Sequence, residues 1–334
     1  MPRQAVPPRR SFRSINLIPL AGLFLLALCA AAPAWAQAAW PTRPVKLVLP
    51  YAPGGATDFI GRPWAEKLQQ AFGQPFVIDN RGGASGAIGT EAVARSAPDG
   101  YTFLLTPGAT LTVLPLLRKV NYSPQKDFVP VADVGDLVCG FVILPALGIN
   151  SIKELVDYAK KNPGKLAYGS AGPGTYSHMR IEMLKLKAGI DILHVPYRGS
   201  ADALNDLLAG QVQLMNEINV IPHVKAGKLK LLDINYSSRH PDFPDVPTLT
   251  EAGYPDTDVA IQFTLQAPAA VPKEIVTALN KKIVEIAATP EMIQRMREIN
   301  VVVPLQTPEQ VAAVQARETE SNRKLIETAK ISMD

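Results

Sequence analysis

The chain has 334 residues, of which 47% are hydrophobic, and carries 34 Lys and Arg against 30 Asp and Glu for a formal net charge of +4. Four arginines within residues 1–36, a segment without acidic residues, account for the whole excess. The remainder is balanced, which argues against nucleic acid or an anionic membrane surface as a partner. At this length we expect a large core and more than one lobe.

The N-terminal segment has the pattern of a secretory signal. A basic stretch precedes an apolar run over residues 17–32, and Ala34-Trp35-Ala36 has the small-x-small pattern of a cleavage site. The run is shorter than the ~18 residues of a membrane span. We therefore predict a signal peptide over residues 1–36. Arg9 and Arg10 leave the twin-arginine route open beside the ordinary secretory route.

The two cysteines are Cys29 and Cys139. Cleavage removes Cys29, so we expect no intrachain disulfide. Cys139 lies in an apolar stretch and is expected to be a buried structural thiol.

The next elements alternate between apolar runs and amphipathic stretches. This alternation predicts α/β units with mostly parallel strands, in two halves. The expected strands span residues 45–50, 75–79, 101–106, 128–134, 141–144, 165–169, 192–195, 211–215, 229–234 and 259–267. The expected helices span residues 57–72, 175–188, 201–209, 273–288, 290–299 and 308–329, with shorter ones ending near Arg95 and beginning after Ser151. We expect the three C-terminal helices to pack on the first half.

The first glycine-rich loop, residues 51–57, lies between a strand and a helix. Its two glycines allow successive backbone N–H groups to turn toward one point, and Thr57 or Asp58 is placed to cap the helix. The helix dipole then favours an anion at this end. A tight turn without a ligand explains this loop equally well when it is taken alone.

A second loop, residues 168–178, repeats the design with Thr175 as the expected cap. Two anion-facing helix starts, one in each half, predict a ligand held between the halves at the carboxyl ends of strands. His178 is placed to donate to a bound carboxylate; a capping or supporting role is the alternative.

Other site classes lack their motifs. No G-x-x-x-x-G-K-[ST] or G-x-G-x-x-G pattern is present, and the four histidines have no zinc-ligand spacing. We therefore expect no nucleotide, metal or cofactor. A hydrolase or transferase that uses Ser170 or Ser85 with His178 is the rival hypothesis, but the G-x-S-x-G elbow is absent.

A third stretch, residues 194–217, brings further polar side chains to strand ends. Tyr197 and Arg198 close a strand and start a helix, and Arg198 is a candidate carboxylate partner or a solvated surface residue. Asn216 and Glu217 follow the next strand. A buried Glu217 beside an anion site would be costly unless it meets a cationic or hydroxyl part of the ligand.

These residues carry a family resemblance. "YAPGGATD", "NRGGASGAIGTEAVARSAPDGYTFLL", "YGSAGPGTYSHM", "HVPYRGSADALNDLLAGQVQLM" and "PDVPTLTEAGYP" occur in the order seen in the Bug family, the bacterial tripartite tricarboxylate transporter substrate-binding proteins. The resemblance covers residues 40–330. It implies a periplasmic binding protein type II-like α/β fold with two lobes, a central cleft and a two-strand hinge. Lobe 1 would contain residues 37–140 and 250–334, and lobe 2 residues 141–249.

The resemblance also implies a function. Such a protein is not an enzyme: it is a periplasmic monomer that binds a small mono-, di- or tricarboxylate and passes it to membrane transporter subunits or a sensor kinase. Tyr176 replaces a small residue and suggests stacking on an aromatic carboxylate. A purely structural periplasmic protein would leave the paired loops without a purpose. The expected ligand-binding residues are Tyr51, Ala52, Gly54, Gly55, Ala56, Thr57, Asp58, Thr106, Ala109, Gly172, Gly174, Thr175, Tyr176, His178, Tyr197, Arg198, Asn216 and Glu217.

Overall fold

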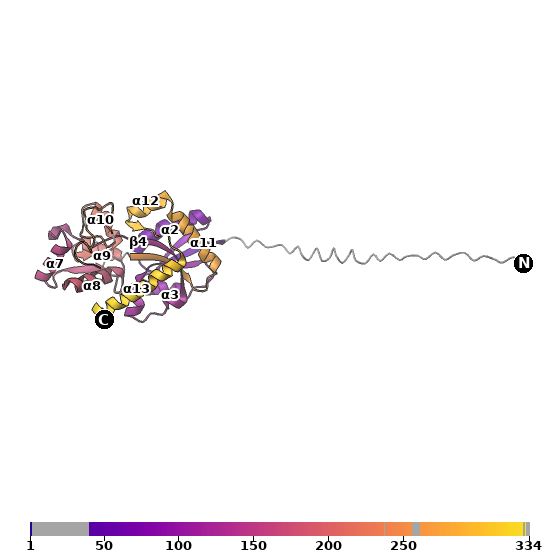
Figure 1. Cartoon of the computed structure of the whole chain (residues 1–334), viewed down its shortest axis with the longest axis horizontal. Coiled ribbons are helices and arrows are strands. Elements are labelled where there is room, and N and C mark those ends of the chain that lie inside the picture. Colours follow the sequence, from indigo (N-terminus) through magenta and orange to yellow (C-terminus); the bar gives the residue numbers. More distant parts are fainter. Residues whose placement is uncertain (2–39, 237, 256–260, 330, 332–334) are drawn as a thin grey trace. The chain divides into compact units, whose positions relative to one another are not determined.

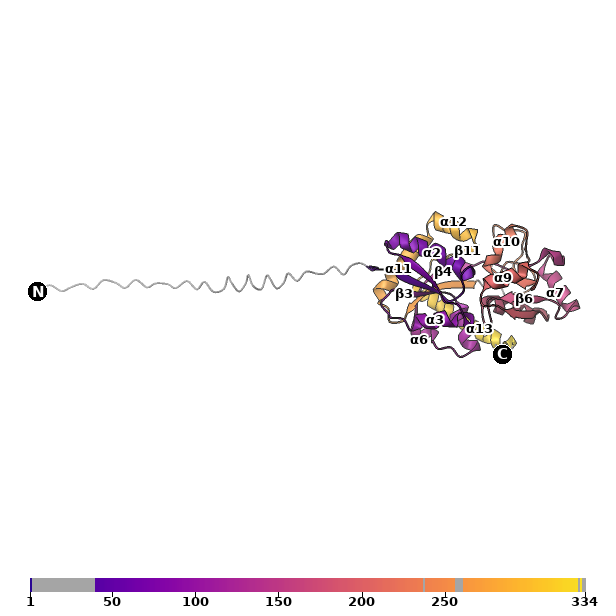
Figure 2. The same cartoon turned by 180° about the vertical axis from the view of Figure 1, so that it is seen from behind.

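The structure, a computed structural model, describes residues 1, 40–236, 238–255, 261–329 and 331. Apart from Met1, the predicted signal peptide lies outside the described residues. Residues 40–334 form one compact unit, shown from two sides in Figures 1 and 2. Among the described residues, none of the helices combines the length and apolar character that a membrane span requires.

The first sheet has six strands within the described residues, in the order β11-β4-β10-β3-β1-β2. β1 pairs in parallel with β2 and β3, whereas β10 is antiparallel to β3 and β4, and β11 is antiparallel to β4. The strands with antiparallel partners include β4, which precedes the second half in the chain, and β10 and β11, which come after it. The strands span β1 Val45–Leu49, β2 Phe76–Asn80, β3 Thr102–Pro107, β4 Phe128–Leu137, β10 Ile261–Pro268 and β11 Val301–Val302.

Helices from both ends of the chain pack around this sheet. The long C-terminal helix α13 (Pro308–Ala329) contacts β4 and also reaches the other half, where it contacts α8 (Tyr176–Ala188). The C-terminal helices therefore return to the first half, as predicted. The remaining helices of this half are α2 Ala56–Phe72, η1 Ala84–Gly86, α3 Ala87–Ala94, α4 Ala109–Thr112, α5 Leu114–Leu117, α6 Pro124–Asp127, α11 Lys273–Ala287 and α12 Pro290–Glu298.

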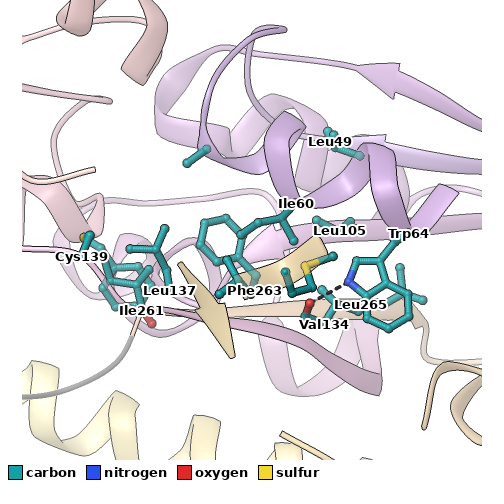
Figure 3. Close-up of a cluster of buried hydrophobic side chains, with 14 of the residues drawn as sticks. Leu49, Ile60, Trp64, Leu105, Val134, Leu137, Cys139, Ile261, Phe263 and Leu265 are labelled. Atoms are coloured by element: carbon teal, nitrogen blue, oxygen red, sulfur yellow. Dashed lines mark hydrogen bonds between the residues drawn. The ribbon is translucent and has the colours of Figure 1, made fainter. Parts of the chain in front are cut away.

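The core of the first half lies between α2 and the sheet (Figure 3). Trp64 is fully buried, and its indole Nε1 donates to the carbonyl of Val134 on β4 at 2.7 Å. Ile60, one turn earlier, packs in the same cluster with Phe263 of β10. The i, i+4 spacing of Ile60 and Trp64 thus fixes α2 on the sheet and holds its N-terminus at the sheet's edge.

The second sheet has five strands within the described part of the chain, in the order β7-β6-β8-β5-β9. β6 is parallel to β7 and β8, and β5 is antiparallel to β8 and β9. A separate apolar cluster supports it. The elements are β5 Val142–Ile143, η2 Pro145–Leu147, α7 Ile152–Lys161, β6 Ala167–Ser170, β7 Leu193–Pro196, α9 Ser200–Leu208, β8 Leu214–Met215, η3 Ile218–Val220, α10 Ile221–Lys225 and β9 Lys230–Leu231.

Two chain segments connect the sheets side by side. The amide of Asn235 donates to the carbonyl of Cys139 at 2.6 Å, and the amide of Leu232 donates to the carbonyl of Phe141 at 2.9 Å. Between them, a Cβ on Gly140 would lie 1.7 Å from the carbonyl oxygen of Asp233. The segments therefore approach so closely that only glycine fits. Cys139 is a buried free thiol, as predicted.

The two α/β halves confirm the predicted class, and the predicted helix over residues 308–329 has the observed bounds. The short elements α4, α5, α6, α10 and β11 were not predicted, because two to five residues carry too little periodicity. The predicted cap of α2 is wrong. The helix begins at Ala56 with Gly55 at the N-cap, and no side chain of the loop caps it.

Candidate functional site

A small cavity lies between the two halves. Its volume is about 30 Å³, which is room for about two water molecules. Both glycine-rich loops contribute to its wall, so the structure brings the two predicted loops together. The lining residues are Tyr51, Ala56, Thr57, Pro107, Ala171, Thr175, Tyr176, Ser200, Glu217, Ile261 and Phe263.

In the described part of the chain, three helices begin at this cavity. Ala56, Tyr176 and Ser200 are the first residues of α2, α8 and α9, and all three line it. The first N–H groups of a helix have no acceptor within the helix, and the dipole places partial positive charge there. The cavity is therefore surrounded by groups that favour an anion.

The first loop is held by Asp58 rather than capped by it. The amide of Gly54 donates to Asp58 Oδ2 at 3.0 Å, and Arg62 Nε donates to the same oxygen at 2.7 Å. Burial works to raise the pKa of Asp58, but these bonds and one from Asn80 outweigh it and hold the pKa below its usual range. Asp58 therefore stays ionised and fixes the turn, and it does not line the cavity.

Ser200 joins the two halves across the cavity. Its Oγ accepts a hydrogen bond from the amide of Ala56 at 3.1 Å, so a hydroxyl from the second half partners the first amide of α2. The neighbouring Thr57 is 4% exposed, and its amide and hydroxyl have no protein partner among the described residues. Thr57 therefore presents two free donors to the cavity.

The second loop has a similar arrangement. Thr175 is the N-cap of α8, as predicted, but its hydroxyl donates to the carbonyl of Gly172 at 2.6 Å and leaves the helix amides free. Gly172 has φ +122° and lies against Ser85 of the first half, where an added Cβ would meet Ser85 Oγ at 2.8 Å. This loop therefore closes directly on the first half, and any side chain at residue 172 would obstruct that closure.

His178 supports the second loop from behind. Its Nδ1 accepts a hydrogen bond from the amide of Gly174 at 3.1 Å, and its ring stacks on that of His194 with centroids 4.3 Å apart. His178 does not line the cavity. Of the two roles left open from sequence, the structure shows the supporting one.

The serine hydrolase hypothesis does not fit this geometry. Ser170 Oγ lies 2.7 Å from Nε2 of His194, not from His178, and Ser170 is fully buried outside the cavity wall. Burial, with His178 and Lys185 nearby, lowers the pKa of His194 to about 3. The predicted partner of Ser170 is therefore wrong, since its hydroxyl contacts His194, and among the described residues no hydrogen bond joins Ser85 to His178.

Tyr176 has a partner outside the cleft. Its hydroxyl donates to Glu318 Oε2 of α13 at 3.0 Å. Burial raises the pKa of Glu318 to about 7. The phenol is therefore fixed between α8 and α13, with its residue forming part of the cavity wall.

Glu217 brings a carboxyl group to the cavity. The side chain follows β8 and is 8% exposed. Burial raises the pKa of Glu217 to about 7, and the Ser177 hydroxyl opposes this rise. Tyr51 lines the same cavity, and its hydroxyl donates to the carbonyl of Ser85 at 2.9 Å. Among the described residues that line the cavity, none is Lys, Arg or His.

Several predicted residues lie outside the cavity wall. The Tyr197 hydroxyl donates to Asp206 at 2.6 Å, and Arg198 is exposed. Asn216 accepts a hydrogen bond from the Cys139 thiol at 3.1 Å and so ties β8 to the segments that connect the sheets. Thr106 and Ala109 are fully buried and do not line the cavity. The predicted glycines and Ala52 shape the loops without appearing in the wall: Ala52, Gly54, Gly55, Gly172 and Gly174.

Sequence reasoning missed five lining residues. Ser200 carried a signal, since a hydroxyl follows Gly199 at a helix start. The apolar lining residues carried no signal, because in sequence an apolar residue at a strand end looks the same whether it lines a cavity or packs in the core. The missed residues are Pro107, Ala171, Ser200, Ile261 and Phe263.

The chain is similar in sequence to a known protein family. Residues 60–331 match the family model described as "Tripartite tricarboxylate transporter family receptor". The chain is similar to Protein BugT of Bordetella pertussis, with 36% identity over 299 residues that cover 88% of this chain and 91% of BugT.

Solved structures agree with the fold. A structure described as R. palustris Rpa4515 with adipate has a TM-score of 0.85 and 34% identity, covering 88% of this chain and 99% of that one. MatC from Rhodopseudomonas palustris with bound malate has a TM-score of 0.81 and 30% identity. The match covers 86% of this chain and 100% of that one. The predicted fold class, of the periplasmic binding protein type, is confirmed.

Proposed function

The chain belongs to the tripartite tricarboxylate transporter receptors, a family of solute-binding proteins, and on this premise we propose that it binds a small organic carboxylate between its two halves. The observation that carries the proposal is the convergence of three helix starts, at Ala56, Tyr176 and Ser200, on one cavity. Backbone amides at such ends bind carboxylates without a basic side chain. The neighbours with adipate and malate support the same ligand class.

The residues have distinct proposed roles. The free amide and hydroxyl of Thr57 donate to a ligand carboxylate from the first half, and the first amides of α8 do so from the second. Ala171, Ile261 and Phe263 contact the carbon skeleton. Ser200 partners Ala56 until a ligand oxygen competes for that amide.

The proposal includes export and delivery. The predicted signal peptide takes the protein to the periplasm, where the loaded monomer passes its ligand to membrane transporter subunits or to a sensor. The two connected segments at residues 138–141 and 232–235 act as the hinge between lobe 1, residues 37–140 and 250–334, and lobe 2, residues 141–249. The protein releases its ligand unchanged.

A thermal-shift screen of the chain purified from the periplasm tests the ligand class. A ligand at a hundred times its Kd adds about 2.7 kcal/mol to the free energy of unfolding, which raises Tm by several degrees. We expect such a rise with one or more organic acids and none with nucleotides or sugars. The acid recovered after incubation should be unchanged. A rise with nucleotides alone, or turnover of the acid, would contradict the proposal.

A further inference from the structure

The cavity has an uneven charge distribution. Each helix start supplies about half a positive charge, so the three starts together offset about one and a half negative charges. Glu217 stands on the same wall, and none of the described lining residues is basic. A dicarboxylate beside an ionised Glu217 would place about three negative charges against them. Such a ligand is poorly compensated, whereas a single carboxylate is well compensated.

Glu217 also lacks a full set of partners. It is 8% exposed, and the Ser177 hydroxyl, which already accepts from the Ala171 amide at 3.2 Å, is the one described group that lowers its pKa. A buried ionised carboxylate needs several donors, because burial without them costs several kcal/mol. Burial raises the pKa of Glu217 to about 7, as expected for an under-compensated acid. A donor on the ligand would supply what the protein does not.

The size of the cavity points the same way. With the halves as close as the Ala56–Ser200 hydrogen bond holds them, the space is about 30 Å³. Pro107, Ile261 and Phe263 give the wall an apolar part beside its hydroxyl-bearing residues. A short ligand needs the least separation of the halves, and its uncharged carbon atoms match these side chains.

From these observations, and resting on the proposed function, we propose that the ligand is a short monocarboxylate that carries a hydrogen-bond donor, an ammonium or hydroxyl group, directed at Glu217. The carboxylate lies at the helix starts, and the donor end contacts the Glu217 carboxylate. Glu217 is thus a specificity-determining residue that disfavours di- and tricarboxylates. This assignment separates the chain from its neighbours described with adipate and malate.

Matched acids that differ only in one end group test the inference by calorimetry at pH 7.5. The three-carbon set is propionate, 3-hydroxypropionate, β-alanine and malonate; the four-carbon set is butyrate, 4-hydroxybutyrate, 4-aminobutyrate and succinate. In the wild-type protein we expect the hydroxyl or ammonium acid of one set to bind at least tenfold more tightly than both the methyl and the carboxylate acid. The better of the two donors identifies the end group.

Variants then assign the preference to Glu217. In Glu217→Gln the amide oxygen still accepts from a hydroxyl, but the charge is gone and the NH₂ group can donate. We expect an ammonium acid to lose at least tenfold in affinity, a hydroxyl acid to change little, and the dicarboxylate of the same length to gain. Glu318→Gln is the matched control. Glu318 is also buried with its pKa raised to about 7, but it is outside the cavity wall. This variant should change all affinities by a common factor and preserve their order.

The outcomes separate the two proposals. Tightest binding of a di- or tricarboxylate or of a plain alkyl acid, or an order unchanged in Glu217→Gln, would overturn the inference and leave the proposed function intact. Failure of every carboxylate in the wider thermal-shift screen would overturn both.

Discussion

Two stacked imidazoles support the second glycine-rich loop. His178 is 5% exposed, and His194 stacks on it on one side and on Tyr168 on the other, with the second pair of centroids 4.7 Å apart. Burial lowers the pKa of both histidines, for His194 to about 3. Glu182 opposes the shift at His178, but Lys185 adds to it at both rings. Both rings are therefore neutral at pH 7.

This pair makes stability depend on pH. An unfolded histidine titrates near pH 6.5, so below that pH the unfolded chain takes up protons that the folded chain does not. The contribution of a group with a lowered pKa is present above pH 6.5 and is lost as the pH falls. Between pH 7.5 and 5.5 the loss for His194 is about 1 kcal/mol after allowance for its partial exposure. Urea unfolding at both values measures it.

Variants isolate the effect from the other acids. Glu217 and Glu318 have raised pKa values and shift stability in the opposite direction. The measured quantity is therefore the difference between wild type and His194→Gln, which should shrink by about 1 kcal/mol between pH 7.5 and 5.5. A constant difference between wild type and His194→Gln across this pH range would show that the stack does not titrate in this way.

At the scale of the elements, the two segments that connect the sheets restrict which residues can occupy position 140. Gly140 lies where the backbones of residues 139–141 and 232–235 are hydrogen-bonded. Its added Cβ would lie 1.7 Å from Asp233 O and 2.6 Å from Asp233 C. Backbone atoms cannot rotate away, so the segments must separate. Gly140→Ala should lower the free energy of unfolding by about 3 kcal/mol or more.

A glycine in open space provides the comparison. Gly148 has φ +68° and no heavy atom within 4 Å of an added Cβ, so Gly148→Ala should cost about 1 kcal/mol, from the left-handed backbone alone. Chemical denaturation of both variants measures the difference. Equal stability would mean that the two segments have room to separate.

The helix α13 is the other element that joins both halves. It contacts β4 and α4 in the first half and α8 in the second. Glu318 accepts from Tyr176 of α8, and Asn322 Nδ2 donates to Thr112 Oγ1 of α4 at 3.3 Å. The helix α13 therefore connects α8, which begins at the cavity in the second half, to the sheet of the first half.

At the scale of the whole molecule, the cavity is too small for a typical carboxylate. Its volume is about 30 Å³, so we expect a ligand to enter when the halves separate and to be enclosed when they close. We expect ligand to shift the population in solution toward the closed form, because only that form surrounds it with three helix starts. Small-angle scattering should show a smaller radius of gyration with saturating ligand.

Hydrogen exchange locates the same change. Amides near Ala56 and Ser200 should exchange more slowly when ligand is bound, because the two residues face each other across the cavity from opposite halves. The distant helix α7 should not change. Identical scattering and exchange with and without a tightly bound ligand would contradict closure.

The sequence by itself determined the α/β class, most long elements and the two glycine-rich loops, because periodicity and glycine spacing are local properties of the chain. Six of the eleven lining residues, including Thr57, Tyr176 and Glu217, were predicted from those loops and strand ends. The role of His178 stayed open, since stacking on His194 depends on the pairing of β6 with β7.

Only the tertiary structure decided which side chains meet. Ser200 lies 144 residues from Ala56 in sequence and yet partners its amide, and Glu318 lies 142 residues from Tyr176 and fixes its hydroxyl. Arg198 was a reasonable candidate that the structure leaves exposed. Contacts across such separations follow from how the sheets and α13 pack, which local spacing does not encode. For the same reason the cavity's charge, three helix starts against one carboxylate, is visible only after the halves are assembled.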